Sequence, residues 1–93
     1  MIINFTHKGL RELFQRGSTT KLSQEHIKRI IRILGIIHAA TEVRDLNVPG
    51  LRLHELKKPP YRGFWSLDVS GNYRIIFRFE NGKASDLDYL DTH

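Results

Sequence analysis

The stretch GFWSLDVSGNYRIIFRFENG at residues 63–82 decides the fold, because its apolar residues alternate with polar ones. Successive side chains of a β-strand point to opposite faces, so this period of two predicts strands. The tripeptide Ser70-Gly71-Asn72 and the pair Asn81-Gly82 supply residues that tolerate positive φ in hairpin turns. The sequence therefore predicts antiparallel neighbouring strands from residue 63 to residue 90.

The predicted sheet has two unlike faces. One face of its central strand carries the apolar set Tyr73, Ile75, Phe77 and Phe79, and the other carries Arg74, Ile76, Arg78 and Glu80. Inward alternation favours core positions for Trp65, Phe77 and Phe79 over the alternative of a platform for stacking RNA bases. Leu51 and Leu53 alternate with Arg52 and His54, which extends the strand pattern upstream to residue 51.

The first half of the chain has the period of helices. After a short apolar run at residues 1–5, which suits a first or edge strand, Thr6 is the expected N-cap of a helix that ends at Gly17. We expect this helix to bury Leu10, Leu13 and Phe14. Ser23 is the expected N-cap of a longer helix, whose buried stripe comprises Ile27, Ile30, Ile31, Leu34 and Ile37, widened by Ile33 and Ile36. Two helices followed by strands predict an α+β fold.

Length and composition bound the possible functions. The 93 residues suffice for one domain, residues 1–93, and they carry 15 Lys and Arg against 10 Asp and Glu. This excess favours an acidic partner such as nucleic acid, although a basic surface that is merely solvated is the alternative. The absence of cysteine excludes a disulfide framework and thiolate metal sites. No apolar run approaches the ~20 residues that span a bilayer, so we expect a cytoplasmic protein without a membrane partner.

Several short motifs occur in order along the whole chain. They are Phe5-x-His7-Lys8-Gly9-Leu10, Leu53-His54-x-Leu56-Lys57, Gly63-Phe64-Trp65-Ser66, Asn72-Tyr73-Arg74-Ile75 and the terminal Asp91-Thr92-His93. With these motifs the chain resembles the HigB type of toxin in the RelE-like group of bacterial toxin–antitoxin systems. The resemblance implies two N-terminal helices packed on a curved antiparallel sheet, and ribosome-dependent cleavage of messenger RNA. It also implies a HigA-type antitoxin that contains a helix-turn-helix. The toxin would contact operator DNA only indirectly, through this antitoxin.

The resemblance also implies a catalytic site. Cleavage of RNA without a metal or cofactor needs a base for the 2′-OH proton, a cation beside the phosphate and an acid for the leaving oxygen. The residues that the resemblance places in this site are His54, Lys57, Arg74, Asp91 and His93. The sequence leaves open which histidine is the acid and which the base. It also leaves open that Arg74 pairs with Asp68 or Asp88, and that Lys57 only protects a sheet edge.

Basic residues and one tyrosine are the expected contacts to ribosomal and messenger RNA, because cations neutralise phosphates and aromatic rings stack on bases. They are Lys28, Arg29, Arg32, Lys57, Lys58, Tyr61, Arg62 and Arg78. The remaining histidines, His7, His26 and His38, are interpreted as surface or cap residues. Asp86, Asp88 and Asp91 are the alternative of a Mg²⁺ site, although alternation puts Asp91 on the other face from the first two.

One position departs from the family pattern. HigB-type chains commonly end Asp-Tyr-His, whereas this chain ends Asp91-Thr92-His93. A threonine neither stacks on a base nor donates a phenolic proton, so the departure bears on rate and base preference more than on the type of reaction. Two further hypotheses remain beside the nuclease: a non-enzymatic toxin of the same fold that inhibits gyrase, and an RNA-binding module that has lost catalysis.

Overall fold

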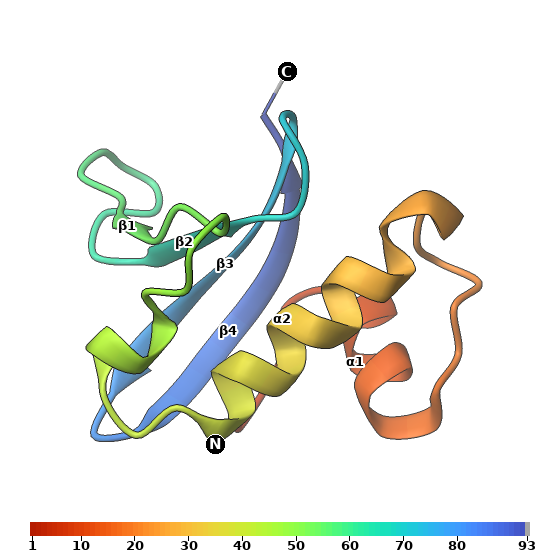
Figure 1. Cartoon of the computed structure of the whole chain (residues 1–93), viewed down its shortest axis with the longest axis horizontal. Helices are drawn as coiled ribbons and strands as arrows, with labels where there is room; N and C mark the ends of the chain where they lie inside the picture. Colours follow the sequence, from red (N-terminus) through yellow and green to blue (C-terminus); the bar gives the residue numbers. More distant parts are fainter. Residues whose placement is uncertain (93) are drawn as a thin grey trace.

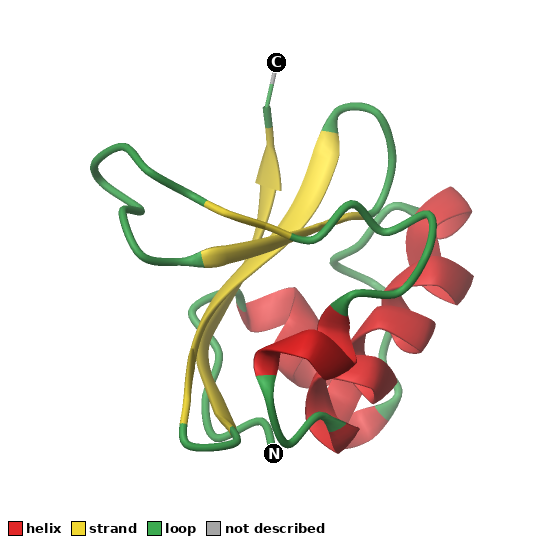
Figure 2. Ribbon diagram, turned by 60° about the vertical axis from the view of Figure 1, so that its left-hand side comes forward, coloured by secondary structure: helices red, strands yellow, loops and turns green. Residues whose placement is uncertain are grey.

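Two helices come first in the chain and a sheet of four strands follows, as the sequence predicts. The computed structural model describes residues 1–92. Its elements are α1 (Lys8–Arg16), the 3₁₀ turn η1 (Gln24–His26), α2 (Ile27–Ala39), the 3₁₀ turn η2 (Val43–Leu46), β1 (His54–Glu55), β2 (Trp65–Asp68), β3 (Tyr73–Glu80) and β4 (Lys83–Asp91). The helices lie on one side of a curved sheet, and the loop between β1 and β2 projects on the other side (Figures 1 and 2).

The strands pair in chain order, β1-β2-β3-β4, and every pair is antiparallel. Both predicted hairpins are present, and the Asn81-Gly82 turn has the positive φ angles, 52° and 76°, that such a turn requires. A β-bulge interrupts the β3–β4 register between Ile76 and Arg78, where Asp86 has a φ of 54°. A bulge bends its strand, which accounts for part of the curvature of the sheet.

Two expected strands are shorter than the pattern predicts. Residues 1–5 form no strand, and only single parallel bridges join Ile2 to Ala84 and Phe5 to Leu87 beside β4. The strand expected from residue 51 is reduced to His54–Glu55. The reason lies at Arg52, whose φ of 51° is incompatible with an extended strand.

One core joins the helices to the sheet. From α2 it takes Ile30, Ile33, Leu34 and Ile37, at the i, i+3, i+4, i+7 spacing of a single stripe. Ile31 lies beside that stripe and is 52% exposed, and Phe14 of α1 is 38% exposed, so the expectation that both are buried is wrong. Phe77 is buried, and Trp65 and Phe79 pack against the core, which confirms the core interpretation of these aromatic residues.

The three histidines of the helical half have structural partners. His7, and not Thr6, caps α1, because its Nδ1 accepts a hydrogen bond of 3.2 Å from the Leu10 backbone N–H. His38 Nδ1 accepts from the Ile2 N–H, and His26 is buried and hydrogen-bonded to the Tyr89 hydroxyl, which corrects the surface interpretation of His26.

The predicted C-terminal end of α1 is correct, whereas the predicted start of α2 is wrong. Gly17 ends α1 with a φ of 71°, as predicted. Ser23 precedes η1 instead of α2, and its side chain makes no capping hydrogen bond. Among residues 1–92, no helix has the length and apolar character needed to cross a membrane.

Candidate functional site

A pocket of about 410 Å³ opens where β1 and the loop after it meet the ends of β3 and β4. Its walls combine histidine, cations, one carboxylate and apolar side chains. The lining residues are His54, Glu55, Leu56, Lys57, Lys58, Tyr61, Arg74, Leu90 and Thr92. The pocket thus brings together His54, Lys57 and Arg74, three of the residues expected to be catalytic, from β1 with its following loop and from β3.

His54 is exposed at the start of β1, and its ring orientation is fixed by the backbone. Its Nδ1 lies 2.8 Å from the carbonyl oxygen of Arg52. A carbonyl can only accept, so Nδ1 carries the proton, and the neutral ring keeps the lone pair on Nε2. The left-handed backbone of Arg52 turns this carbonyl back towards the ring. His54 is therefore held in the tautomer in which Nε2 can take up a proton.

Lys57 lies beside a carboxylate that the sequence did not single out. Its Nζ donates to Glu55 Oε1 at 3.2 Å, and both side chains line the pocket. This ion pair is at the surface, where such pairs contribute little to stability. Its effect is local, because it holds the ammonium group beside the pocket and moderates the positive charge there.

Arg74 projects from β3 into the same pocket. Its Cα partners are Asp68 on β2 and Leu90 on β4. Asp68 forms its ion pair with Arg52 instead, at 3.7 Å, and no ion pair within the described range involves Arg74. Arg74 therefore pairs with neither Asp68 nor Asp88 within residues 1–92, and it lines the pocket instead.

The end of β4 places Thr92 in the pocket and Asp91 outside it. Leu90 and Thr92 both line the cavity, whereas Asp91 is the Cα partner of Tyr73, whose side chain belongs to the helix side of the sheet. Thr92 donates both its backbone N–H, at 2.6 Å, and its hydroxyl, at 2.9 Å, to the carbonyl of Asn72. His93, the other terminal residue expected to be catalytic, lies outside the described residues.

The expected RNA contacts divide into two groups. Lys57, Lys58 and Tyr61 line the pocket, and Arg62 is exposed in the same loop. The others lie elsewhere: Arg78 stacks its guanidinium 5.0 Å above the Phe64 ring and pairs with Asp86, and Arg29 donates to the backbone carbonyls of Gly50 and Asp68. Lys28 and Arg32 are exposed on α2. Only the loop group surrounds the pocket.

An aromatic cluster supports the strand ends on the helix side. The Tyr73 and Tyr89 rings stack at 5.2 Å, His26 contacts both, and His7 meets Tyr89 edge-on. Burial is the main cause that raises the pKa of Tyr89 to about 12, so this phenol is neutral and keeps its hydrogen bond to His26. The cluster lies directly behind Arg74 and Leu90, the residues next along each strand, and it stiffens this edge of the pocket.

Sequence reasoning missed Glu55, Leu56 and Leu90 as pocket residues. Leu56 lies inside the motif Leu53-His54-x-Leu56-Lys57, and Leu90 is next to Asp91. An apolar residue type does not by itself indicate a place in a catalytic pocket. The proposed Mg²⁺ alternative gains no support, since no group of three His, Cys, Asp or Glu residues within residues 1–92 is arranged to hold a metal ion.

The arrangement of helices and strands is an α+β fold that a solved structure shares. The solved structure of YafQ from E. coli superposes with a TM-score of 0.56 over 98% of this chain and 91% of that one, and at 12% identity this likeness concerns the fold alone.

Comparison of the sequence with known proteins identifies the family. Residues 3–93 match the family described as RelE-like toxin of type II toxin-antitoxin system HigB, so the chain belongs to this family, as its motifs predict. It is 43% identical over 93 residues to "Endoribonuclease HigB" of Proteus vulgaris, with the whole of both chains covered. It is also 30% identical to "Toxin HigB-1" of Vibrio cholerae, covering all of this chain and 98% of that one. Membership of a type II system implies a cognate antitoxin.

Proposed function

We propose that the chain is an endoribonuclease toxin that cleaves messenger RNA on the ribosome. The observation that carries the proposal is the pocket, which gathers His54, Lys57 and Arg74 beside the side chains of Leu56, Tyr61 and Leu90. The name of the Proteus vulgaris relative, an endoribonuclease at 43% identity over the full length, supports the same activity. A HigA-type antitoxin and the ribosome are the proposed partners, and the cytoplasm is the proposed site of action.

The proposed reaction is attack of the 2′-oxygen of one nucleotide on its own 3′-phosphate. His54 Nε2 takes the 2′-OH proton, because the bond from Nδ1 to Arg52 leaves that lone pair available. The new O2′–P bond forms as the P–O5′ bond breaks, which leaves a 2′,3′-cyclic phosphate and a 5′-hydroxyl. Lys57 and Arg74 stabilise the charge that develops on the phosphorane oxygens.

The leaving 5′-oxygen needs a proton. We assign this role to His93, at the end of the chain, which follows Thr92 at the edge of the pocket. Asp91 faces the other side of β4 by alternation, so we propose that it positions the terminal segment instead of transferring a proton itself.

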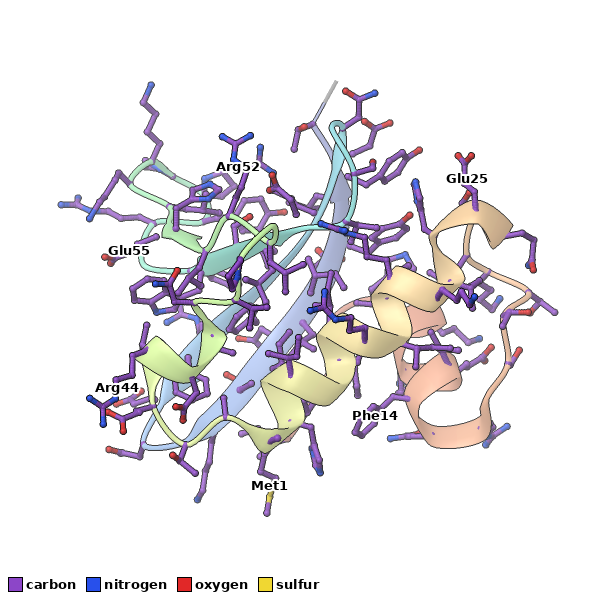
Figure 3. The ribbon with its side chains drawn as sticks, viewed as in Figure 1. Met1, Phe14, Glu25, Arg44, Arg52 and Glu55 are labelled. Carbon is purple, nitrogen blue, oxygen red and sulfur yellow. The ribbon has the colours of Figure 1, made fainter. Side chains whose placement is uncertain are left out.

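Induction of the protein in cells, followed by mapping of 5′ ends in messenger RNA, tests the proposal. Wild type should create new 5′-hydroxyl ends within translated regions. His54→Ala, Arg74→Ala and deletion of His93 should each abolish these ends, because a general acid or base contributes ~10²–10⁴-fold in rate. Arg44→Ala is the matched control, since this exposed side chain of η2, labelled in Figure 3, pairs with Glu42, does not line the pocket and should leave cleavage unchanged. Growth arrest without new ends, accompanied by loss of DNA supercoiling, would favour the gyrase inhibitor.

A further inference from the structure

A second concave surface lies between α1 and α2. Figures 1 and 2 show these helices on the side of the sheet opposite the loop that forms the pocket. This groove has a volume of about 200 Å³ and is lined by Leu13, Phe14, Ile31, Leu34 and Gly35. Phe14 and Ile31, 38% and 52% exposed, both contribute to it. One exposed apolar residue is ordinary, but two that line the same groove are typical of an interaction surface. Figure 3 shows the Phe14 ring beside α2.

Gly35 is the least expected residue of this groove. It lies within α2, where glycine lowers helix stability relative to alanine. A Cβ built on Gly35 meets nothing within 4 Å, so no contact inside the chain requires the absence of a side chain. Its backbone has no positive φ either. A glycine that the fold itself does not need fits a place where another backbone approaches closely.

The charges around the groove are all of one sign. On a helix, residues three apart are neighbours, so Arg11 adjoins Phe14, Lys28 adjoins Ile31 and Arg32 adjoins Gly35. α2 contains no acidic residue, and no ion pair within residues 1–92 involves these three cations. An RNA backbone would leave Phe14 and Ile31 uncovered. A second copy of the chain would place its own Arg11, Lys28 and Arg32 against these three cations, which would repel one another.

We propose that the groove is the docking site for an amphipathic segment of the cognate antitoxin, with apolar residues against Phe14 and Ile31, acidic residues beside Arg11, Lys28 and Arg32, and its backbone over Gly35. The inference rests on the type II partnership and is independent of the nuclease chemistry. It separates two surfaces, since the apolar groove binds protein and the pocket with its basic loop binds RNA.

Titration of the purified antitoxin from the same operon onto the full-length toxin tests the proposal by calorimetry. Gly35→Trp should raise the dissociation constant at least about tenfold, because it forces a large side chain into a closely packed contact. Gly35→Ala should weaken binding severalfold although it raises the melting temperature of the free toxin by a few degrees, so misfolding cannot explain the loss. Arg32→Glu should slow association in a salt-dependent way.

Arg44→Leu, which adds an exposed apolar side chain within η2, is the control and should bind the antitoxin normally. Cleavage by Gly35→Ala should equal that of wild type, and failure of the nuclease proposal would leave the binding result interpretable. An unchanged dissociation constant for Gly35→Trp overturns the proposal. Loss of ribosome co-sedimentation by Gly35→Trp, with antitoxin binding intact, would also overturn it and would assign the groove to the ribosome. Dissociation of a toxin dimer by Gly35→Trp would overturn it as well and would assign the groove to a second copy of the chain.

Discussion

The Nδ1 of His54 donates a 2.8 Å hydrogen bond to the carbonyl oxygen of Arg52, two residues upstream. This bond exists because Arg52 adopts a left-handed backbone, with a φ of 51°, immediately before β1. Such a conformation costs a non-glycine residue roughly 1–2 kcal/mol and persists only where the surroundings maintain it. Here the ion pair with Asp68 and the pairing of β1 with β2 hold the segment. Backbone strain at Arg52 thus fixes the tautomer of the proposed base.

Replacing Arg52 tests this coupling. Arg52→Gly should keep cleavage close to the wild-type rate, because glycine adopts positive φ freely and still presents a carbonyl to His54. Arg52→Val should lower both the melting temperature and the rate, since a β-branched residue is strongly disfavoured at this φ. Thermal unfolding and cleavage assays on the two variants make the comparison. Equal rates for the glycine and valine variants would show that the Arg52 carbonyl has no part in catalysis.

Charge reversal of the loop, Lys57→Glu with Lys58→Glu, should weaken association with the ribosome. Lysines that contact phosphates release counterions, so their loss lowers both the affinity and its dependence on salt. Lys28→Glu with Arg32→Glu is the matched control, because it changes the charge equally on α2, away from the pocket. Co-sedimentation across a salt series distinguishes them. If both double variants lost affinity equally, ribosome binding would follow net charge and not this loop.

The sequence predicts the fold well where a local signal suffices. Asn81-Gly82 and Gly17 adopt the positive φ angles expected of them, and the β3 alternation gives the core face correctly. It fails where one backbone angle decides, as at Arg52, which shortens β1, and at Asp86, which creates the bulge. Neither an arginine nor an aspartate by itself predicts a positive φ at a given position.

The candidate site shows the same division. The motifs identify His54, Lys57 and Arg74, which the fold brings into one pocket. They do not reveal that Thr92 faces this pocket and Asp91 does not, because that depends on the register at the end of β4. They also give no sign of Gly35 as part of a groove, since its role depends on α1 lying alongside.

Removal of free metal should leave the chemistry unaffected. The pocket is lined by histidine and cations, and its carboxylate, Glu55, is paired with Lys57, so its donor set does not suit a divalent cation. Cleavage should therefore persist in chelator concentrations at which the ribosome retains its own Mg²⁺. Primer extension on ribosome-bound message is the measurement. Cleavage of free RNA that begins only when Mn²⁺ or Mg²⁺ is added would contradict the proposed mechanism.

Stability should fall as the solution becomes mildly acidic, in part because of His7. Burial lowers the pKa of His7 below the ordinary histidine value of 6.5, and protonation would also remove the acceptor that caps α1. A depressed pKa means that the unfolded chain binds the proton more readily, so this stabilisation is complete above pH 6.5 and is lost as the pH falls.

His7→Asn provides the comparison, because asparagine caps a helix well and does not titrate. Between pH 7.5 and pH 5.5, two values chosen as about one unit either side of the ordinary histidine pKa, the variant should lose less melting temperature than wild type. His7→Ala should be less stable at both values by ~1 kcal/mol, since it removes the cap. Parallel losses in wild type and His7→Asn would assign the acid sensitivity to other groups.

Thr92 is the subject of the last prediction, because it lines the pocket together with Tyr61 and Leu90, at the position where HigB-type chains commonly have tyrosine. A ring at this position would add a stacking surface, and stacking of a base on an aromatic side chain is worth ~1–3 kcal/mol. Thr92→Tyr should therefore raise cleavage and sharpen the base preference seen in mapped 5′ ends. Thr92→Ala should change little, since the backbone N–H still binds the carbonyl of Asn72. The opposite pattern, with the alanine variant inactive and the tyrosine variant unchanged, would show that the hydroxyl of Thr92, now bonded to Asn72, is itself required.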